Sequence, residues 1–341
     1  MPPLSTTTNR TELLAFYTEM QRIRRMEVES DKLYKNKLIR GFLHLYNGQE
    51  AVATGLEHNM TPEDSTITAY RDHAFMVTRR CGSDPKHVLA ELCGRKDGVS
   101  AGKGGSMHMY NIPKNFYGGN GIVGAQVPLG TGLAFAQKYN KTKNVTFCYF
   151  GDGAANQGQV FEAFNMAKLW KLPIIYVCEN NKYAMGTSAE RSSSNTEYYT
   201  RGDYVPGLQV DGMDVLKVKE VGKYAMDYAL NHGPILLEMK TYRYMGHSMS
   251  DPGTSYRTRA EIQKMREQYD PIAKVKKYLL DNNAAEEKEL KAIDKEIKKE
   301  MDAAVKFAKA SAEPPAEALY QGVYQEDVPI RGIELSNSYS P

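Results

Sequence analysis

The sequence predicts an α/β protein with a central, mostly parallel sheet flanked by helices and with a helical extension at its C-terminal end. Residues 145–150 and 173–178 are continuous apolar and β-branched runs, which are typical of buried parallel strands. Between them, residues 156–170 have the length and composition of a helix. A strand, a helix and a second strand in succession form the crossover unit of parallel sheets.

Three further segments come before these strands. Residues 10–60 have apolar side chains at helical spacing, with residues 48–51 opening the next segment. Residues 64–92 are predicted to form a short strand, a polar turn and a helix. Residues 94–132 contain 11 of the chain's 28 glycines, whereas an even distribution would place about three there. This density predicts loops that are pressed against a ligand.

The C-terminal part is richer in Lys and Glu from residue 260 onward, and residues 288–309 have a helical pattern that ends before a pair of prolines. We expect this part to be a solvated or partner-facing extension with a structural role and no chemistry of its own. The chain is therefore predicted to form one domain over residues 1–341, with the helical extension at residues 261–341.

Composition limits the function classes. A chain of 341 residues with 41% hydrophobic residues can bury a large core, and its net charge of +3 gives no reason to expect a nucleic acid or an anionic membrane as partner. The longest apolar runs are too short to span a bilayer. We expect no transit peptide in residues 1–10, which are rich in Thr and contain one Arg. Four cysteines without paired spacing predict a reducing compartment: Cys81, Cys93, Cys148 and Cys178.

Polar residues follow both predicted strands. Asp152, in Gly-Asp-Gly, follows the first strand and Asn181, in Asn-Asn, follows the second, so both are expected at the sheet edge where open α/β sheets bind ligands. The helix between them points its positive N-terminus at the same edge. Carboxylate and amide oxygens are donors that magnesium prefers. Gly-Asp-Gly alone is usually a turn, but together with the asparagine pair at this spacing it predicts a metal that bridges a diphosphate.

This pair of motifs resembles the thiamine diphosphate motif, and residues 151–188 as a whole resemble one family of thiamine diphosphate proteins more specifically. Those residues are similar to the alpha subunits of the pyruvate dehydrogenase component of the 2-oxoacid dehydrogenase complexes. The resemblance extends from about residue 42 to residue 317. It implies a thiamine diphosphate-binding fold with a cofactor-binding core at residues 40–260.

The resemblance further implies an oxidoreductase that binds thiamine diphosphate and magnesium and acts with a beta subunit in an alpha-two beta-two heterotetramer. The implied reaction is the oxidative decarboxylation of pyruvate, with transfer of the acetyl group to the lipoyl group of dihydrolipoyl acetyltransferase for acetyl-CoA formation. In this family the glutamate that protonates the aminopyrimidine ring comes from the beta subunit, and we find no matching acid in this chain. A kinase and a phosphatase are further expected partners. The implied location is the mitochondrial matrix, with the bacterial cytoplasm as the alternative.

The cofactor contacts implied by the resemblance are Tyr70, Arg71, Gly121, Val123, Gly151, Asp152, Gly153, Ala154, Asn181, Tyr183 and His247. The implied metal ligands are Asp152, Asn181 and the carbonyl of Tyr183. Arg71 follows a predicted strand at residues 65–69 and offers a fork of donors to the diphosphate, with a surface salt bridge as the alternative.

Residues 119–124 also match the glycine pattern of dinucleotide-binding proteins. No apolar strand precedes them, however, and no acidic residue follows at the required distance, so this interpretation lacks its structural context. By resemblance, the main chain of Gly121 and Val123 in this loop instead contacts the aminopyrimidine ring.

Two of the seven histidines, His44 and His247, match family positions in the active-site channel. Near a dianionic cofactor such an imidazole could stay protonated and assist proton transfer to the lipoyl sulfur. The remaining histidines are interpreted as structural: His58, His73, His87, His108 and His232.

Residues 246–259 resemble the family's regulatory loop, and the resemblance implies phosphorylation at three serines: Ser248, Ser255 and Ser188. A phosphate of about −2 charge on Ser248 would stand beside His247 and near Asp251, so repulsion should disorder the loop. The alternative is that these are ordinary loop serines. Met245 departs from the pattern, because some relatives carry His there.

Two other functions stay open at this point. The chain could be the alpha subunit of a branched-chain 2-oxoacid or acetoin dehydrogenase, although residues 154–159 and 246–259 look like the pyruvate type. It could also be a non-catalytic interaction subunit, which the intact Asp152, Asn181 and Arg71 disfavour.

Overall fold

A five-stranded parallel sheet forms the centre of the structure, a computed structural model that describes residues 7–324. In the order β1-β2-β3-β7-β6, the strands are Ser65–Ile67, Thr146–Gly151, Ile174–Asn180, Ile235–Lys240 and Gly207–Asp211. A separate antiparallel ladder pairs β4 (Tyr183–Ala184) with β5 (Thr187–Ser188). The predicted α/β class, with its mostly parallel sheet, is confirmed.

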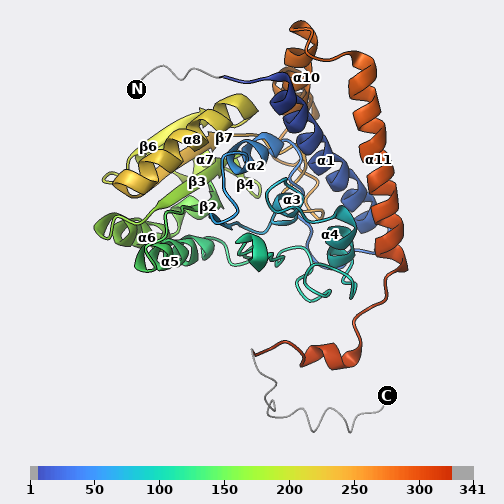
Figure 1. Cartoon of the computed structure of the whole chain (residues 1–341), viewed down its shortest axis with the longest axis horizontal. Coiled ribbons are helices and arrows are strands. Elements are labelled where there is room, and N and C mark those ends of the chain that lie inside the picture. The colour runs from blue at the N-terminus through green and yellow to red at the C-terminus, as the bar shows by residue number, and fades with distance from the viewer. Residues whose placement is uncertain (1–6, 325–341) are drawn as a thin grey trace.

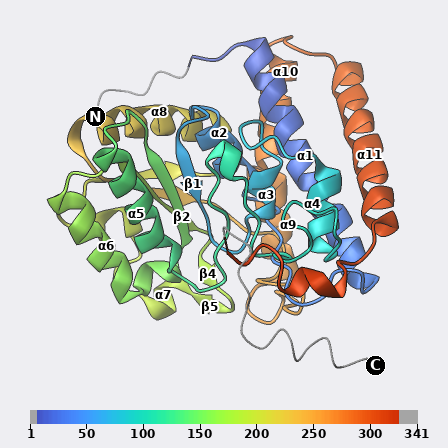
Figure 2. The same cartoon turned by 60° about the horizontal axis from the view of Figure 1, so that its bottom comes forward.

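Helices cover both faces of this sheet, which explains why its central strands are apolar along their whole length. Phe147 and Tyr149 of β2 pack into one core together with residues of α2 (Glu50–Glu57) and α8 (Val215–His232). The alternate side chains of β2, Cys148 and Phe150, belong to a second core with α5 (Gln126–Tyr139) and α6 (Gly158–Leu169). The resulting three layers are visible in Figure 1 and, from the side of α5, in Figure 2.

Close packing of α5 on the sheet depends on a glycine. A Cβ atom at Gly130 would lie 2.9 Å from the Cβ of Cys148 and 3.0 Å from a side-chain carbon of Ile67. These distances are shorter than ordinary carbon contacts, so a larger side chain would push the helix away from β1 and β2.

Three helices pack together beside the sheet (Figure 1): the long helices α1 (Arg10–Lys35) and α11 (Glu287–Ala310) and the shorter α10 (Pro271–Asp281). Phe16 and Tyr17 of α1 share a core with Val275 and Leu279 of α10 and with Leu290 of α11. The helix predicted at residues 288–309 is confirmed as α11. Its packing shows that this part of the C-terminal extension is attached to the first helix of the chain.

The remaining helices are short. The α-helices are α3 (His73–Met76), α4 (Pro85–Leu92), α7 (Ala189–Ser192) and α9 (Arg259–Tyr269), and the 3₁₀ helices are Ile112–Lys114, Ala154–Asn156, Tyr198–Thr200 and Ala316–Leu319. None of the helices within residues 7–324 combines the length and the hydropathy that are needed to cross a bilayer.

Some boundaries differ from the sequence-based expectations. The helical pattern of residues 10–60 is interrupted at Lys35, because Lys37 adopts a left-handed conformation with φ of 60° and the chain is irregular up to α2. The first strand ends at Ile67, two residues earlier than predicted. The helix predicted from residue 156 begins at Gly158, after a 3₁₀ turn.

The glycine-rich segment serves a protein side chain as well as the predicted ligand site, which corrects the expectation for residues 94–132. The buried carboxylate of Glu91 accepts main-chain hydrogen bonds from Ser100, Gly102 and Gly104 at 2.8 Å each and from Gly105 at 3.0 Å. Several glycines therefore wrap around an internal anion. Density of glycine alone could not distinguish this from a bound ligand.

The ends of the chain limit two expectations. Residues 1–6 and 325–341 lie outside the described part, so the expectation about a transit peptide and the last part of the extension are not addressed by the structure. The division into a core at residues 40–260 and an extension at residues 261–341 stays a prediction.

Candidate functional site

A cavity of about 280 Å³ opens at the carboxyl edge of β2 and β3. Asp152 directly follows β2 and Asn181 directly follows β3, so the two meet at this edge as predicted. The cavity is lined by most of the residues selected from the sequence: Tyr70, Val123, Gly151, Asp152, Gly153, Ala154, Asn181, Tyr183 and His247. Their roles toward a ligand stay predictions.

A smaller cavity of about 30 Å³ adjoins the first and shares Tyr70, Gly151 and Asn181 with it. Arg71 lines this smaller cavity, together with Gln49 and other residues. The diphosphate contacts predicted from the sequence therefore lie in two connected parts of one site.

Two predicted residues line neither cavity. The ring of His44 lies 4.4 Å from that of Tyr70 and 5.0 Å from that of His247, so it stands behind these cavity residues. Gly121 precedes Val123 in the loop at the cavity and faces His108. Both are close to the site without forming its wall.

The two predicted side-chain ligands of a metal have different surroundings. Asp152 is buried, and this burial raises its pKa to about 6 against the opposing effect of main-chain N–H groups and Arg243. The amide nitrogen of Asn181 donates to Oε1 of Gln49 at 3.2 Å, and its amide oxygen accepts from the main chain of Tyr183 at 3.4 Å, which leaves that oxygen a second lone pair for another partner. A cation would compensate the charge of Asp152 and use that oxygen.

Protein side chains alone do not complete a metal site here. Within residues 7–324, no group of three His, Cys, Asp or Glu side chains is arranged to hold a metal ion. A cation at Asp152 would therefore need further oxygens from main-chain carbonyls, water or a bound ligand, as a diphosphate would provide.

Two buried arginines carry positive charge to the cavities. Arg71 donates to the carbonyls of Leu45 at 2.6 Å and His247 at 2.9 Å, and it is 6% exposed. Arg243 is 1% exposed and donates to the carbonyl of Met245 at 3.0 Å. Neither guanidinium has a carboxylate partner in the described part of the chain. The surface salt bridge considered for Arg71 is thus not observed.

Sequence reasoning did not select Arg243. Burial, followed by the nearby charge of Arg71, lowers the pKa of Arg243 to about 10. Two cations that are close together and shielded from water disfavour each other's charged form. Its position three residues after Lys240, the end of β7, was an available signal because Arg71 also closely follows a strand, four residues after the end of β1. A pair of uncompensated buried cations fits an anionic ligand such as a diphosphate.

The two candidate catalytic histidines, His44 and His247, have lowered pKa values. Burial and then Arg71 lower the pKa of His44 to about 2, and burial with Arg71 and Arg243 lowers the pKa of His247 to about 3. The expected protonation near a dianionic cofactor therefore requires the anion, which would offset the two arginines.

The loop at residues 246–257 is held by two side chains. Asp251 accepts from the main chain of His247 at 2.6 Å and from the hydroxyl of Tyr256 at 2.6 Å. Arg257 donates to the carbonyls of Arg243 at 2.6 Å and Met245 at 2.8 Å. The loop is thereby tied to the segment that carries Arg243, and it places His247 at the cavity.

The three candidate phosphorylation sites differ in accessibility. Ser248 is 9% exposed and its hydroxyl lies 2.9 Å from that of Ser250. Ser255 is exposed, and Ser188 caps α7 by accepting from the main chain of Arg191 at 3.3 Å. Modification of Ser248 would require the loop to open.

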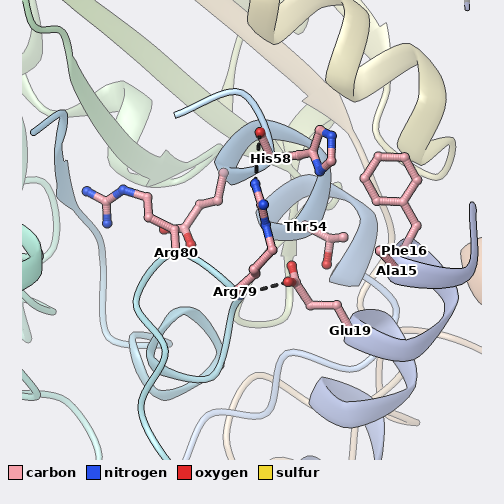
Figure 3. A pocket seen from close by; sticks show the side chains of 8 residues that line it. Ala15, Phe16, Glu19, Thr54, His58, Arg79 and Arg80 are labelled. Atoms are coloured by element: carbon pink, nitrogen blue, oxygen red, sulfur yellow. Dashed lines mark hydrogen bonds between the residues drawn. The ribbon is translucent and has the colours of Figure 1, made fainter. Parts of the chain in front are cut away.

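A separate pocket between α1 and α2 has room for about one water molecule, with a volume of about 10 Å³. Figure 3 shows Arg79 in this pocket between Glu19 and the carbonyl of His58. The main chain of Arg79 donates to Glu19 at 2.7 Å. None of the predicted site residues lines the pocket, and its interactions are internal to the fold.

The fold and the cavity together define an α/β protein that presents buried arginines and a carboxylate at the carboxyl edge of a parallel sheet. A model of the family described as "Dehydrogenase E1 component" matches residues 18–317, so the chain belongs to this family. The resemblance drawn from the sequence is confirmed.

Relatives of high identity carry a more specific name. The chain is 58% identical over 341 residues to the mitochondrial pyruvate dehydrogenase E1 component subunit alpha of Dictyostelium discoideum, covering 100% of this chain and 89% of that protein. It is 56% identical over 334 residues to the human somatic form, covering 97% and 85%. It is 58% identical over 332 residues to the alpha-2 subunit of Arabidopsis thaliana, covering 97% and 84%.

These findings confirm several predictions at the level of the family. The chain is a dehydrogenase subunit of the alpha type, from a family that depends on thiamine diphosphate in general and whose alpha subunits work with a beta subunit. The relatives are named as mitochondrial proteins, in agreement with the predicted mitochondrial location and not with the bacterial alternative.

Proposed function

We propose that this chain is the alpha subunit of a pyruvate dehydrogenase that decarboxylates pyruvate oxidatively and passes the acetyl group to the lipoyl group of dihydrolipoyl acetyltransferase. The observation that carries the proposal is the pair of adjoining cavities at the sheet edge, the larger lined by Asp152 and Arg243 and the smaller by Arg71. It occurs in a chain that is 56–58% identical to named pyruvate dehydrogenase alpha subunits. These names favour pyruvate over the branched-chain and acetoin alternatives.

The residues of the cavity fit thiamine diphosphate with magnesium. Arg71, Arg243 and Tyr70 would hold the diphosphate, and the main-chain N–H groups of Gly153 and Ala154 would add donors at the start of a helical turn. The bound cofactor would supply the electron sink for decarboxylation.

The metal and the ring would use other residues of the same wall. Asp152, the amide oxygen of Asn181 and the carbonyl of Tyr183 would hold the cation, since all three residues line the cavity. The main chain of Gly121 and Val123 would contact the aminopyrimidine ring. A cation at Asp152 would also keep this carboxylate ionised, which its burial alone disfavours.

The chain's own proton-carrying groups near the cavity are His247 and, behind it, His44. Because burial and then Arg71 and Arg243 lower the pKa of His247, its ring stays neutral until an anion offsets the charge of the arginines. With a diphosphate bound, His247 would be able to hold a proton and deliver it to the lipoyl sulfur.

A beta subunit completes the site in this proposal, in an alpha-two beta-two heterotetramer. Two apolar side chains at the cavity, Val123 and Met185, are 44% and 62% exposed, and the neighbouring Ile122 is 73% exposed. Such a rim is suited to cover by another chain. The acid that acts on the aminopyrimidine ring would come from that chain.

Regulation by a kinase and a phosphatase is proposed at Ser248, Ser255 and Ser188. A phosphate on Ser248 would enter a buried position beside the carboxylate of Asp251, which already holds the loop. The negative charge would break those contacts and remove His247 from the cavity. Inhibition would then follow locally, without a distant relay.

The test uses the chain co-expressed with a beta chain, because the alpha subunit alone is expected to lack activity. Wild-type complex should bind thiamine diphosphate only when Mg²⁺ is present and should decarboxylate pyruvate. Asp152→Asn should lose the Mg²⁺-dependent part of the binding, since it removes the charged ligand while keeping the shape. Calorimetric titration and release of carbon dioxide would measure both effects.

Two results would contradict the proposal. Unchanged Mg²⁺-dependent affinity in Asp152→Asn would remove this residue from the ligand set. Decarboxylation by the isolated alpha chain would overturn the requirement for a partner, and binding without turnover in the complex would favour the non-catalytic interaction subunit.

A further inference from the structure

Glu238, in β7, is a fully buried carboxylate without a cation to balance it among the described residues. Three neutral donors converge on it instead. Oε1 accepts from the amide of Asn180 at 2.7 Å, and Oε2 accepts from the main chain of Tyr199 at 3.2 Å and from the amide of Gln209 at 3.1 Å. Because all three partners donate, an acceptor-only side chain is required at this position.

Asn180 is also hydrogen-bonded to the turn that follows β3. Its side-chain oxygen accepts from the main chain of Lys182 at 3.1 Å, and Lys182 has a left-handed backbone with φ of 72°. Such a conformation is unfavourable for a residue with a side chain and persists where its surroundings hold it. The amide of Asn180 therefore fixes a strained turn, and Glu238 fixes the amide.

The turn carries two of the three groups proposed to hold the cation. Asn181 lies within it and Tyr183 directly follows it, and both line the cavity. After burial, Asp152 and Glu238 both contribute to the raised pKa of Cys178, so both carboxyl groups lie near this part of β3. The hydrogen bonds from Glu238 through Asn180 to the turn are the contacts that would orient ligands of a cation.

We propose that Glu238 is a positioning residue for the divalent cation, acting through Asn180 on the turn at residues 180–182 and on Tyr183, which follows it. This inference rests on the proposed function, because it takes Asn181 and the Tyr183 carbonyl as ligands. Residues behind a metal's direct ligands typically change its affinity by about 10- to 100-fold when they are altered.

A hydrogen-bond exchange tests this role in the complex with the beta chain. In Glu238→Gln, the two donors of Tyr199 and Gln209 should retain the glutamine oxygen, so its NH₂ group would face the donor of Asn180. This should weaken the binding of Mn²⁺, used as a spectroscopic probe for Mg²⁺, by about 10- to 100-fold. The double variant Glu238→Gln with Asn180→Asp restores a donor–acceptor pair with its direction reversed. It should return the affinity to within about threefold of wild type.

Free Mn²⁺ would be measured by electron paramagnetic resonance at a fixed concentration of thiamine diphosphate, and thermal unfolding would be followed in parallel. Gln209→Ala is the matched control, because it removes a donor from the other oxygen of Glu238 and leaves Asn180 in place. Its Mn²⁺ affinity should stay within about threefold of wild type. Asn180→Ala, which keeps two donors on Glu238, should weaken Mn²⁺ binding like Glu238→Gln and covers the case in which that variant does not assemble.

The outcomes separate this inference from the function on which it rests. If the wild-type complex binds no Mn²⁺ with thiamine diphosphate, the proposed cation site falls, and this inference falls with it. If wild type binds Mn²⁺ and the variants at Glu238 and Asn180 bind it equally well, or lose only thermal stability, Glu238 is merely structural. Failure of the exchanged pair to recover affinity would likewise overturn the inference.

Discussion

At the scale of single residues, the charge balance of the cavity is set by Arg71 and Arg243. Both are buried and both use main-chain carbonyls as acceptors, so their charges are solvated by dipoles and not neutralised. Arginine keeps its charge in such surroundings, where a lysine would lose it more readily. The pair lowers the pKa of His247 and would stabilise a diphosphate, so one arrangement affects both proton transfer and binding.

The contribution of Arg243 can be measured directly. Arg243→Gln should weaken the binding of thiamine diphosphate to the complex by about 10- to 100-fold, because a hydrogen bond to a charged group contributes about 1.5 to 3 kcal/mol. Calorimetric titration at saturating Mg²⁺ would give the affinity. Arg22→Gln is the control, since it removes the same charge from a partly exposed pair with Glu300. Equal affinities of the two variants would exclude a contact between Arg243 and the diphosphate.

At the scale of elements, the loop at residues 246–257 joins the site to the surface. Asp251 and Arg257 order it from within, while Ser255 is exposed and Ser248 is not. Burial opposes the ionisation of Asp251, but hydrogen bonds from His247 and Tyr256 outweigh it and lower the pKa of Asp251. The loop therefore already contains one ionised carboxylate, and a second charge at Ser248 would be repelled.

This contrast predicts different effects at the two serines. Ser248→Asp should reduce pyruvate decarboxylation by the complex by about tenfold or more, because an unsatisfied buried charged group costs more than about 1 to 3 kcal/mol. Ser255→Asp, which places its charge in solvent, should reduce it less. Hydrogen exchange of residues 246–257 should rise in the first variant. Full activity of Ser248→Asp with an ordered loop would contradict local inhibition.

Some elements of the site follow from sequence alone for a physical reason. Asp152 and Asn181 directly follow apolar strands, and parallel strands bring their carboxyl ends to one edge, so local pattern was enough. Arg243 and Glu238 reach the same place only because β7 pairs with β3, a contact that no local pattern specifies. The glycine-rich segment is a different case. Its glycines do surround an anion, as the local pattern suggested, but several of them bind the carboxylate of Glu91 and not a ligand.

At the scale of the whole molecule, the hydrophobic pattern predicted the layered architecture because burial of both sheet faces leaves strands that are apolar throughout. The segment predicted to open at residues 48–51 agrees with α2, which begins at Glu50, but the end of α1 at Lys35 was not predicted, since it depends on a left-handed residue, Lys37. A helix end that depends on one backbone conformation cannot be predicted from the spacing of apolar residues. The layers can be predicted, because many apolar residues in several strands and helices indicate the same arrangement.

The whole molecule also contains buried carboxylates whose ionisation opposes folding. Burial raises the pKa of Glu57, Asp72 and Glu179 to about 7 each. For such groups the folded state binds more protons than the unfolded state between the ordinary carboxyl pKa and pH 7, so stability decreases as pH rises through this window. His44 and His247 have lowered pKa values and act in the opposite direction at lower pH.

Comparing wild type with the variant Glu57→Gln measures how Glu57 contributes to the pH dependence of stability. Glu57 lines the small pocket between α1 and α2, away from the proposed site, and Arg80 and Thr78 only partly offset its burial. Glu57→Gln should match wild type in stability only well below pH 4.5, where the acid is neutral in both states, and its advantage should grow with pH to on the order of 3 kcal/mol above pH 7, the energy of this pKa shift.

Urea unfolding from pH 5 to 8 would record the difference, in which the effect of the histidines cancels because both proteins contain them. Glu296→Gln, at an exposed position on α11, should leave the pH dependence unchanged. Parallel curves for wild type and Glu57→Gln would mean that Glu57 is ionised in the folded protein at little cost, with Arg80 as its effective counterion.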